Sequence, residues 1–378
     1  MDFINKELAA LRRRGLYREF KTLDAATDRL ITLYGTTFLC FSSNNYLGLA
    51  NDPRLIAAAR QALDDYGVGA AASRLVSGNQ RIHRELERRL AEFKGTEAAI
   101  VFPTGYMANL GAVSALVHEG DAVILDRLNH ASIIDAVRLS RAKLLVYSHC
   151  DLDSLEQVLA RARTHRRRLV VTDTLFSMDG DIAPLREIAL LAKRYGAMVM
   201  ADDAHGTGVL GDNGRGALEH AACEGEVDVV MGTLSKALGG LGGFIAGERR
   251  LIEYLRNTAR SFIYTTALPA AMCAAALAAL DIVEAEPERR AALRENIALF
   301  KAGLRAKGFD LDHTPAPIVP IILGEPARAM NKARELYAHH IFVPAIRPPT
   351  VPKGTSRLRV SLMAGHTRDD VERLVSLL

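Results

Sequence analysis

The chain has 378 residues, of which 49% are hydrophobic and 24% are charged. These fractions are close to the averages of globular proteins and exclude disordered, collagen-like and coiled-coil chains. Lysine and arginine exceed aspartate and glutamate by 48 − 44 = 4 charges, and both signs are spread along the chain, so the charge gives no reason to expect a nucleic-acid partner. At roughly 150 residues per domain, the length predicts two or three domains.

The cysteines and the apolar stretches favour a cytoplasmic protein. Cys40, Cys150, Cys223 and Cys273 lie far apart and form no Cys-x-x-Cys pair, so neither a disulfide framework nor a metal site is expected. The start of the chain is too charged for an export signal. The longest uncharged stretch, 261–280, contains a proline and several hydroxyl residues, which makes it a poor membrane span.

Hydrophobic patterns predict a helix-covered sheet in the first two thirds of the chain. Residues 1–40 contain a basic amphipathic helix and a short extended segment, and residues 52–95 contain two helices around a loop. From about 97 to 247, short apolar runs alternate with helical patterns. Such runs are typical of strands buried on both faces and, alternating with helices, predict a largely parallel sheet. The runs are 98–102, 122–126, 144–147, 169–173, 197–203, 227–233 and 243–247.

The last hundred residues have a different pattern. A long helical region at 270–306 is followed by strands around 317–323 and 357–362 and by helices near 326–339 and 367–377, which indicates a smaller α+β domain. We therefore predict an α/β fold in three parts. These are an N-terminal segment (1–40), a large α/β domain (41–280) and a small α+β domain (281–378).

The most informative polar cluster follows the strand at 197–203. Asp202 ends this strand, and His205 comes three residues later, at the sheet edge where open α/β folds bind ligands. Three interpretations remain open. In the first, Asp202 caps the turn and His205 is a satisfied loop histidine, which is the commoner case for an isolated Asp-x-x-His. In the second, the pair binds a metal, although no further ligand clusters nearby. In the third, the pair contacts a cofactor.

A glycine pattern in the same region gives a weaker signal. The sequence GTGVLG at 206–211 satisfies the dinucleotide pattern Gly-x-Gly-x-x-Gly. That pattern should run from a strand directly into a helix, whereas DNGRG follows here and is a poor helix start. The interpretation of the chain as a nicotinamide-dependent dehydrogenase has no support other than this pattern.

Lys236 lies in the segment 232–243, between a buried strand and a glycine-rich turn. A lysine deprived of water is more readily neutral and nucleophilic. If Lys236 stood alone, a lysine facing water would be the better interpretation. Thr233 and Ser235 lie beside it, however, and offer hydroxyls suited to a phosphate oxygen.

Two further segments add to this pattern. In FPTGYMAN (102–109), a strand leads into a helix whose first amides, at Gly105 and Tyr106, are suited to phosphate. His130 follows the next strand, where its flat ring could stack on a cofactor, although a lone histidine there is more often a core or capping residue. A nucleophilic lysine, a carboxylate and a phosphate cradle together are what pyridoxal 5′-phosphate requires.

These motifs identify the chain as similar to the α-oxoamine synthase family of fold type I pyridoxal-phosphate enzymes. Members of this family condense an amino acid with an acyl thioester and release CO2. The resemblance covers essentially the whole chain. It is carried by FSSNNYLGL (41–49), SRLVSGN (73–79), TGYMAN (104–109), DRLNHAS (126–132), FSMDGD (176–181), DDAHGTG (202–208), TLSKALGG (233–240), IYTTALP (263–269) and AIRPPTVPKGTSRLRVSL (345–362).

The resemblance implies four catalytic residues. Lys236 matches the lysine that attaches the cofactor and moves the Cα proton, and Asp202 matches the carboxylate that keeps the ring nitrogen protonated. His205 and Ser177 match partners of the ring oxygen. His130 matches the imidazole that stacks on the ring beside the substrate.

The resemblance also implies phosphate and substrate positions. Gly105, Tyr106, Thr233 and Ser235 fall at phosphate positions, and Thr265 or Thr266 would reach the phosphate of a neighbouring subunit, which implies a homodimer with shared active sites. Asn44 and Arg347 match positions that hold the amino-acid carboxylate, for which an arginine fork is well suited. Arg18 and Thr350 match substrate-side positions.

One short segment of the sequence indicates which substrates the resemblance implies. AIRPPTVPKGT (345–355) most resembles members that join L-alanine to a pimeloyl thioester in biotin synthesis. The alternatives are members that join glycine to acetyl-CoA, or members with a relaxed acyl preference. The basic runs at 12–14 and 166–168 are interpreted first as solvated helix faces. They would otherwise attract the phosphates of CoA or an acidic acyl-carrier protein.

Overall fold

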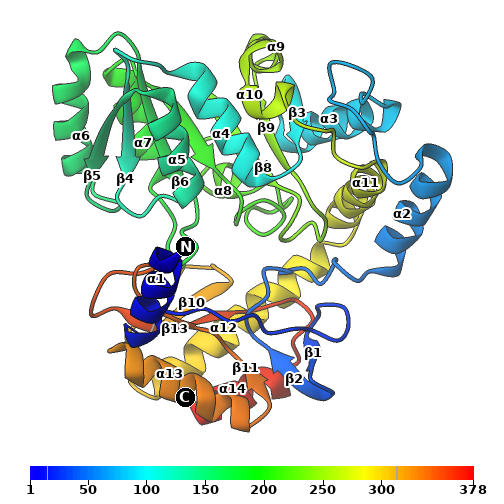
Figure 1. Cartoon of the computed structure of the whole chain (residues 1–378), viewed down its shortest axis with the longest axis vertical. Coiled ribbons are helices and arrows are strands. Elements are labelled where there is room, and N and C mark those ends of the chain that lie inside the picture. Colours follow the sequence, from blue (N-terminus) through cyan, green and yellow to red (C-terminus); the bar gives the residue numbers. More distant parts are fainter. Residues whose placement is uncertain (15, 312–313) are drawn as a thin grey trace.

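A computed structural model describes residues 1–14, 16–311 and 314–378. Its larger lobe (Figure 1) is built on a sheet of seven strands. The strand order is β3-β9-β8-β7-β6-β4-β5. Only β9 runs antiparallel to its neighbours, which confirms the predicted, largely parallel sheet. The strands are β3 (Ala98–Phe102), β4 (Ala122–Asp126), β5 (Lys143–Tyr147), β6 (Arg168–Asp173), β7 (Met198–Asp202), β8 (Val229–Thr233) and β9 (Gly243–Gly247).

Helices cover both faces of this sheet because the central strands are apolar on both sides. In β4, Ile124 packs into one hydrophobic core and Val123 into the other, as the alternation of side chains along a strand requires. The core containing Val123 is covered by α4 (Gly105–Leu116), α5 (Ala131–Ser140), α9 (Arg249–Thr258) and α10 (Arg260–Ile263). The other is covered by α2 (Pro53–Tyr66), α3 (Arg81–Lys94), α6 (Leu152–Arg161), α7 (Leu185–Arg194) and α11 (Ala270–Ala285).

The second lobe holds two three-stranded sheets. One sheet has the order β10-β13-β12 and the other β1-β2-β11, so the beginning of the chain pairs with its C-terminal part. The division into 1–40, 41–280 and 281–378 stays a prediction. The elements of this lobe are α1 (Asp2–Arg13), β1 (Leu30–Leu33), β2 (Thr36–Cys40), α12 (Pro287–Ala306), β10 (Ile318–Gly324), α13 (Pro326–Ala338), β11 (Ile341–Phe342), β12 (Ala345–Ile346), β13 (Ser356–Ser361) and α14 (Arg368–Leu377).

The structure differs from the sequence prediction in two places. The helical region 270–306 is two helices, because Pro287 begins α12, and proline fits a first helical turn but cannot continue a helix. The second basic run does not lie on a helix face. It leads into β6, where Arg166 Nε donates to Asp121 Oδ1 at 3.0 Å and Arg167 donates to the Leu116 carbonyl. No helix in the described part of the chain is long and apolar enough to cross a membrane.

Candidate active site

A cavity of about 290 Å³ lies at the carboxyl ends of β6, β7 and β8. This is the edge at which open parallel sheets bind ligands. Nine of the residues singled out from the sequence line the cavity although they are spread over some 130 positions of the chain. They are Gly105, Tyr106, His130, Ser177, Asp202, His205, Thr233, Ser235 and Lys236.

Lys236 follows β8 in a turn closed by two backbone bonds. The Leu234 amide donates to the Gly242 carbonyl at 3.0 Å, and the Gly239 amide donates to the Lys236 carbonyl at 2.9 Å. Loss of water around the amine lowers the pKa of Lys236 to about 8, although the carboxylates of Asp202 and Asp173 act in the opposite direction. A substantial share of this amine is therefore neutral near physiological pH and able to act as a nucleophile.

Asp202 ends β7 and is 5% exposed. One carboxylate oxygen accepts a hydrogen bond from Asn109 Nδ2 at 2.7 Å, and the other accepts from the Ala204 amide at 3.1 Å. Asp202 thus caps the following turn, as one interpretation of the sequence held, and also faces the cavity. These two roles are compatible.

A second carboxyl group, that of Asp173, lies beside Asp202. The two residues are paired in register at the ends of β6 and β7. Burial and the neighbouring charge of Asp202 hold the pKa of Asp173 well above its usual range, because two close carboxylates cannot both ionise at low cost. Asp173 accepts the backbone N–H of His130 at 3.1 Å and so fixes the position of this histidine.

His130 caps the N-terminus of α5, and its ring is tied to Asp202 through two intervening side chains. Its Nδ1 lies 2.7 Å from Ser132 Oγ, which accepts from Asn109 Nδ2 at 2.9 Å. Burial lowers the pKa of His130, with Asp202 acting in the opposite direction. The four residues Asp202, Asn109, Ser132 and His130 therefore form one continuous chain of hydrogen bonds.

His205 is 8% exposed, and its Nδ1 lies 2.7 Å from the hydroxyl of Tyr46. Burial, together with the positive charges of Lys236 and Arg359, holds the pKa of His205 well below its usual range. The imidazole is therefore neutral and able to offer one hydrogen-bond donor. Among the described residues, no metal-ligand cluster involves Asp202 or His205.

Two segments meet at the site expected for phosphate. Thr104 caps α4 by accepting the Met107 amide at 3.1 Å, and helical bonding begins at Ala108, which leaves the amides of Gly105 and Tyr106 for an anion. A Cβ at position 105 would meet the Met231 side chain at 2.9 Å. Glycine at this position therefore permits the close approach of α4 to β8, whose Thr233 Oγ1 lies 2.8 Å from Ser235 Oγ.

These features fit pyridoxal 5′-phosphate. The cavity offers a nucleophilic amine, a carboxylate held in place by Asn109, and a helix N-terminus beside two hydroxyls. One further observation supports the fit, because Asn109 Oδ1 is buried without a partner among the described residues. Such an atom is costly unless a ligand completes the site.

The remaining predicted residues do not line this cavity. Asn44 is the nearest by contact, since its Oδ1 accepts from the Tyr46 hydroxyl and from Arg359 Nη2, both at 3.2 Å. The Thr350 amide donates to the Arg347 carbonyl at 3.1 Å, just beyond β12. Arg18 lies between α1 and β1, and Thr266 forms an isolated bridge with Ser73. Thr265 is half-buried next to it.

The structure also brings in residues that the sequence analysis missed. Asp173 gave a usable signal, because it ends a buried strand as Asp202 does. Asn109 lies one helical turn after Gly105 and shares its face. No strand end or helix face of this kind pointed to the other three residues, which are Ser132, Tyr46 and Arg359. Arg359, in β13, is 6% exposed and donates to the Ser177 carbonyl at 2.5 Å, to Ser361 Oγ and to Asn44.

Comparison with known proteins defines the class. The family model for class I and II aminotransferases matches residues 36–378, so the chain belongs to this family of fold type I pyridoxal-phosphate enzymes, and the predicted resemblance is confirmed. The 8-amino-7-oxononanoate synthase of Geobacter sulfurreducens is 50% identical over 373 residues, covering 98% of this chain and 95% of the relative. The protein of the same name from Anaeromyxobacter dehalogenans is 51% identical over 378 residues, covering 100% and 95%.

Solved structures agree with this classification. A serine palmitoyltransferase variant from S. paucimobilis with a bound PLP–myriocin aldimine has a TM-score of 0.94 at 35% identity, and the match covers 100% of this chain and 96% of that one. An 8-amino-7-oxononanoate synthase from Francisella tularensis has a TM-score of 0.79 at 31% identity, with coverages of 90% and 96%. The chain therefore shares its fold with members of the family that act on different substrates.

Proposed function

We propose that this protein is a pyridoxal-phosphate-dependent acyltransferase that condenses L-alanine with a pimeloyl thioester. The products are 8-amino-7-oxononanoate, CO2 and the free thiol, and the reaction belongs to biotin synthesis. The structural observation that carries the proposal is the placement of Lys236, with its lowered pKa, in one cavity with Asp202 and His130. The full-length relatives that bear the name of this synthase support the substrate choice.

The cofactor would be held by residues already in place. Lys236 would bond to it covalently, Asp202 would hold a proton at the ring nitrogen, and His205 with Ser177 would contact the ring oxygen. Gly105, Tyr106, Thr233 and Ser235 would bind the phosphate. When bound, pyridoxal phosphate supplies an electron sink for the bonds broken at Cα of the amino acid.

The protein's own part in the reaction is positioning and proton transfer. With the amino acid bound, the amine of Lys236 would remove the proton from Cα and later return one. The Asn109 N–H and the Ala204 N–H both donate to the Asp202 carboxylate and would hold it in place at the ring nitrogen. The neutral ring of His130 lines the cavity and would bound its substrate side.

The amino-acid carboxylate needs a cationic partner. The sequence resemblance assigns Asn44 and Arg347, and we retain this assignment. The geometry adds Arg359, because the groups to which it donates, the Ser177 carbonyl, Ser361 and Asn44, are all uncharged. No ion pair to Arg359 occurs among the described residues. A buried guanidinium without a carboxylate is suited to an anionic substrate.

A homodimer with shared active sites is part of the proposal. Val68, Val76 and Tyr264 are 84%, 81% and 72% exposed, and the two segments that carry them are joined by the Ser73–Thr266 bridge. An exposed apolar patch of this kind favours an interface. It lies beside Thr265 and Thr266, which would then reach the phosphate of the neighbouring subunit. The acyl donor, CoA or a carrier protein, and the cytoplasmic location stay predictions.

One comparison favours a second candidate. The serine palmitoyltransferase superimposes over the whole chain with the higher of the two TM-scores, so the fold itself does not select the acyl chain. An enzyme with relaxed acyl preference, or one that joins glycine to acetyl-CoA, would use the same cavity.

Thiol release by the cofactor-loaded protein tests the proposal. We expect release with L-alanine plus pimeloyl-CoA to exceed release with glycine plus acetyl-CoA at least tenfold in kcat/KM. The reverse preference would keep the class and the mechanism but would reject the assigned substrates. The absence of release with every pair would reject the acyltransferase.

A further inference from the structure

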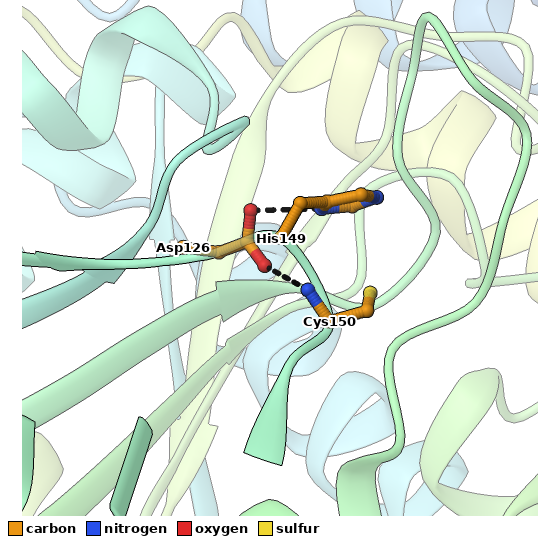
Figure 2. Close-up of side chains that lie close together, drawn as sticks. All are labelled: Asp126, His149 and Cys150. Atoms are coloured by element: carbon orange, nitrogen blue, oxygen red, sulfur yellow. Dashed lines mark hydrogen bonds and ion pairs between the residues drawn. The ribbon is translucent and has the colours of Figure 1, made fainter. Parts of the chain in front are cut away.

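A cluster outside the cavity joins three segments that lead to it. His149 follows β5, and its Nδ1 lies 2.9 Å from Oδ1 of Asp126, the last residue of β4. Its Nε2 lies 2.5 Å from Oδ2 of Asp181, in the connection between β6 and α7. Figure 2 shows the Asp126 carboxylate also accepting the backbone N–H of Cys150, at 2.8 Å.

The imidazole of His149 carries a positive charge in this arrangement. Burial acts to lower the pKa of His149, but the hydrogen bonds to Asp126 and Asp181 outweigh it and raise the pKa to about 12. The Asp126 side chain is fully buried. Both ring nitrogens therefore donate, each to a carboxylate, and the bonds are of the strong, charge-assisted kind.

The connection held by His149 carries Ser177, which lines the cavity. The Phe176 amide donates to the Asp181 carbonyl at 3.0 Å, so the chain folds back on itself around Ser177. The ring of Phe176 packs edge-on against His149, with centroids 4.5 Å apart. His149 thus contacts the residue before Ser177 and the residue that closes the turn after it.

The same cluster also has the composition of a metal site, because ligand atoms of Asp126, His149 and Cys150 lie within 4.8 Å of one another. Two observations oppose that interpretation. Two ligands of one tetrahedral zinc lie about 3.3 Å apart, whereas the Asp126–His149 contact has hydrogen-bond length. Burial also raises the pKa of the Cys150 thiol, and it is the thiolate that binds metal.

We propose that His149 is a positioning residue, an imidazolium that clasps Asp126 and Asp181 and thereby fixes Ser177 against the cofactor. Nothing in the sequence pattern or the comparisons assigns a role to this cluster. The inference depends on the proposed function only in taking Ser177 as a partner of the cofactor ring. The clasp itself is a property of the protein without cofactor.

The first test is His149→Gln, with Asp181→Asn as a second variant that leaves the buried Asp126 in place. In cofactor-free protein, we expect backbone amides at 175–181 to exchange hydrogen at least tenfold faster in both variants. Exposed His220 provides the matched control, and His220→Gln should leave exchange unchanged. Unchanged exchange in both clasp variants, with correct folding, would overturn the proposal.

The second test asks whether the clasp acts through Ser177. His149→Gln and Ser177→Ala should each weaken binding of pyridoxal phosphate about tenfold and shift the absorbance band of the bound cofactor in the same direction. The double variant should add little beyond either single change, because residues that act as a unit are not additive. Fully additive effects would reject the action through Ser177.

Two further outcomes separate this proposal from others. Stoichiometric zinc binding that His149→Gln abolishes would replace the clasp with a metal site and overturn the proposal. If the wild-type protein bound no pyridoxal phosphate, the proposed function would fail, yet hydrogen exchange at 175–181 would still decide whether the clasp exists.

Discussion

Asn109 donates to Asp202 at 2.7 Å and to Ser132 at 2.9 Å through the same side-chain nitrogen. Because Ser132 also contacts His130, this amide joins the carboxylate at the end of β7 to the imidazole at the start of α5. One side chain therefore positions both the residue expected at the ring nitrogen and the residue expected to stack on the ring.

Replacing Asn109 by alanine should impair the reaction without unfolding the protein. Asp202 would keep only the Ala204 N–H, and loss of a hydrogen bond to a charged group costs about 1.5–3 kcal/mol. We expect kcat to fall roughly ten- to hundredfold, with a changed absorbance band of the bound cofactor. Asn257→Ala, at an exposed helical position, is the control. A kcat within twofold of the wild type would show that Asn109 does not position Asp202.

The lowered pKa of Lys236 predicts a pH dependence of cofactor attachment. The neutral amine is the reactive form, so the rate at which pyridoxal phosphate attaches to cofactor-free protein should rise with pH around a midpoint near 8. Asp202 raises this pKa, so Asp202→Asn should move the midpoint to lower pH. Stopped-flow absorbance between pH 6 and pH 10 measures both midpoints. A midpoint near 10.5 in the wild type would contradict the account.

The same pKa predicts a stability effect in the cofactor-free protein. Because the folded-state pKa lies below the unfolded value, the charged amine destabilises the fold below about pH 8, and this cost disappears as pH rises from 8 to 10.5. Lys236→Met should therefore stabilise the cofactor-free protein at pH 7 by roughly 3 kcal/mol, and by much less at pH 10.5. Denaturant unfolding at the two pH values checks this difference. An equal effect at both would contradict it.

Arg359 and Arg357 form a matched pair for testing carboxylate recognition. Both are buried in β13, but Arg357 is ion-paired with Asp179 at 2.5 Å, whereas Arg359 donates to uncharged groups. We expect Arg359→Lys to raise the KM for L-alanine at least tenfold, because lysine cannot form a bidentate bond. Arg357→Lys should change this KM much less. If Arg359→Lys and Arg357→Lys raise this KM equally, both arginines act through folding. If only Arg347→Lys raises it, the carboxylate is held as the sequence resemblance implies and not by Arg359.

The exposed apolar patch of Val68, Val76 and Tyr264 is the surface that we expect to form the dimer interface. Val76→Asp should yield a monomer in sedimentation and should weaken cofactor binding, since a partner threonine would no longer reach the phosphate. Leu190, which is 51% exposed on α7, gives the control variant Leu190→Asp. A dimer that persists in Val76→Asp would place the interface elsewhere.

Much of the cavity could be predicted because its residues follow strands. Asp202 is the last residue of a buried strand, and His130 and Lys236 lie just beyond one. Parallel strands place such positions at one edge of the sheet. Asp173 obeys the same rule and could have been found. Tyr46 and Arg359 could not, because they reach His205 and Ser177 from far along the chain and depend on how the second lobe packs against the sheet. His149 and Asp181 are a similar case, since their pairing depends on the fold of an irregular connection.

We expect Lys236 to be the residue that holds pyridoxal phosphate in this cavity. Borohydride reduction of the cofactor-loaded protein makes the lysine–cofactor bond permanent, and peptide mass mapping then locates it. We predict a single modified peptide that carries the group on Lys236, and none in Lys236→Ala, which should also lose thiol release while remaining folded. Modification of another lysine in the wild type, or turnover retained by Lys236→Ala, would contradict the account.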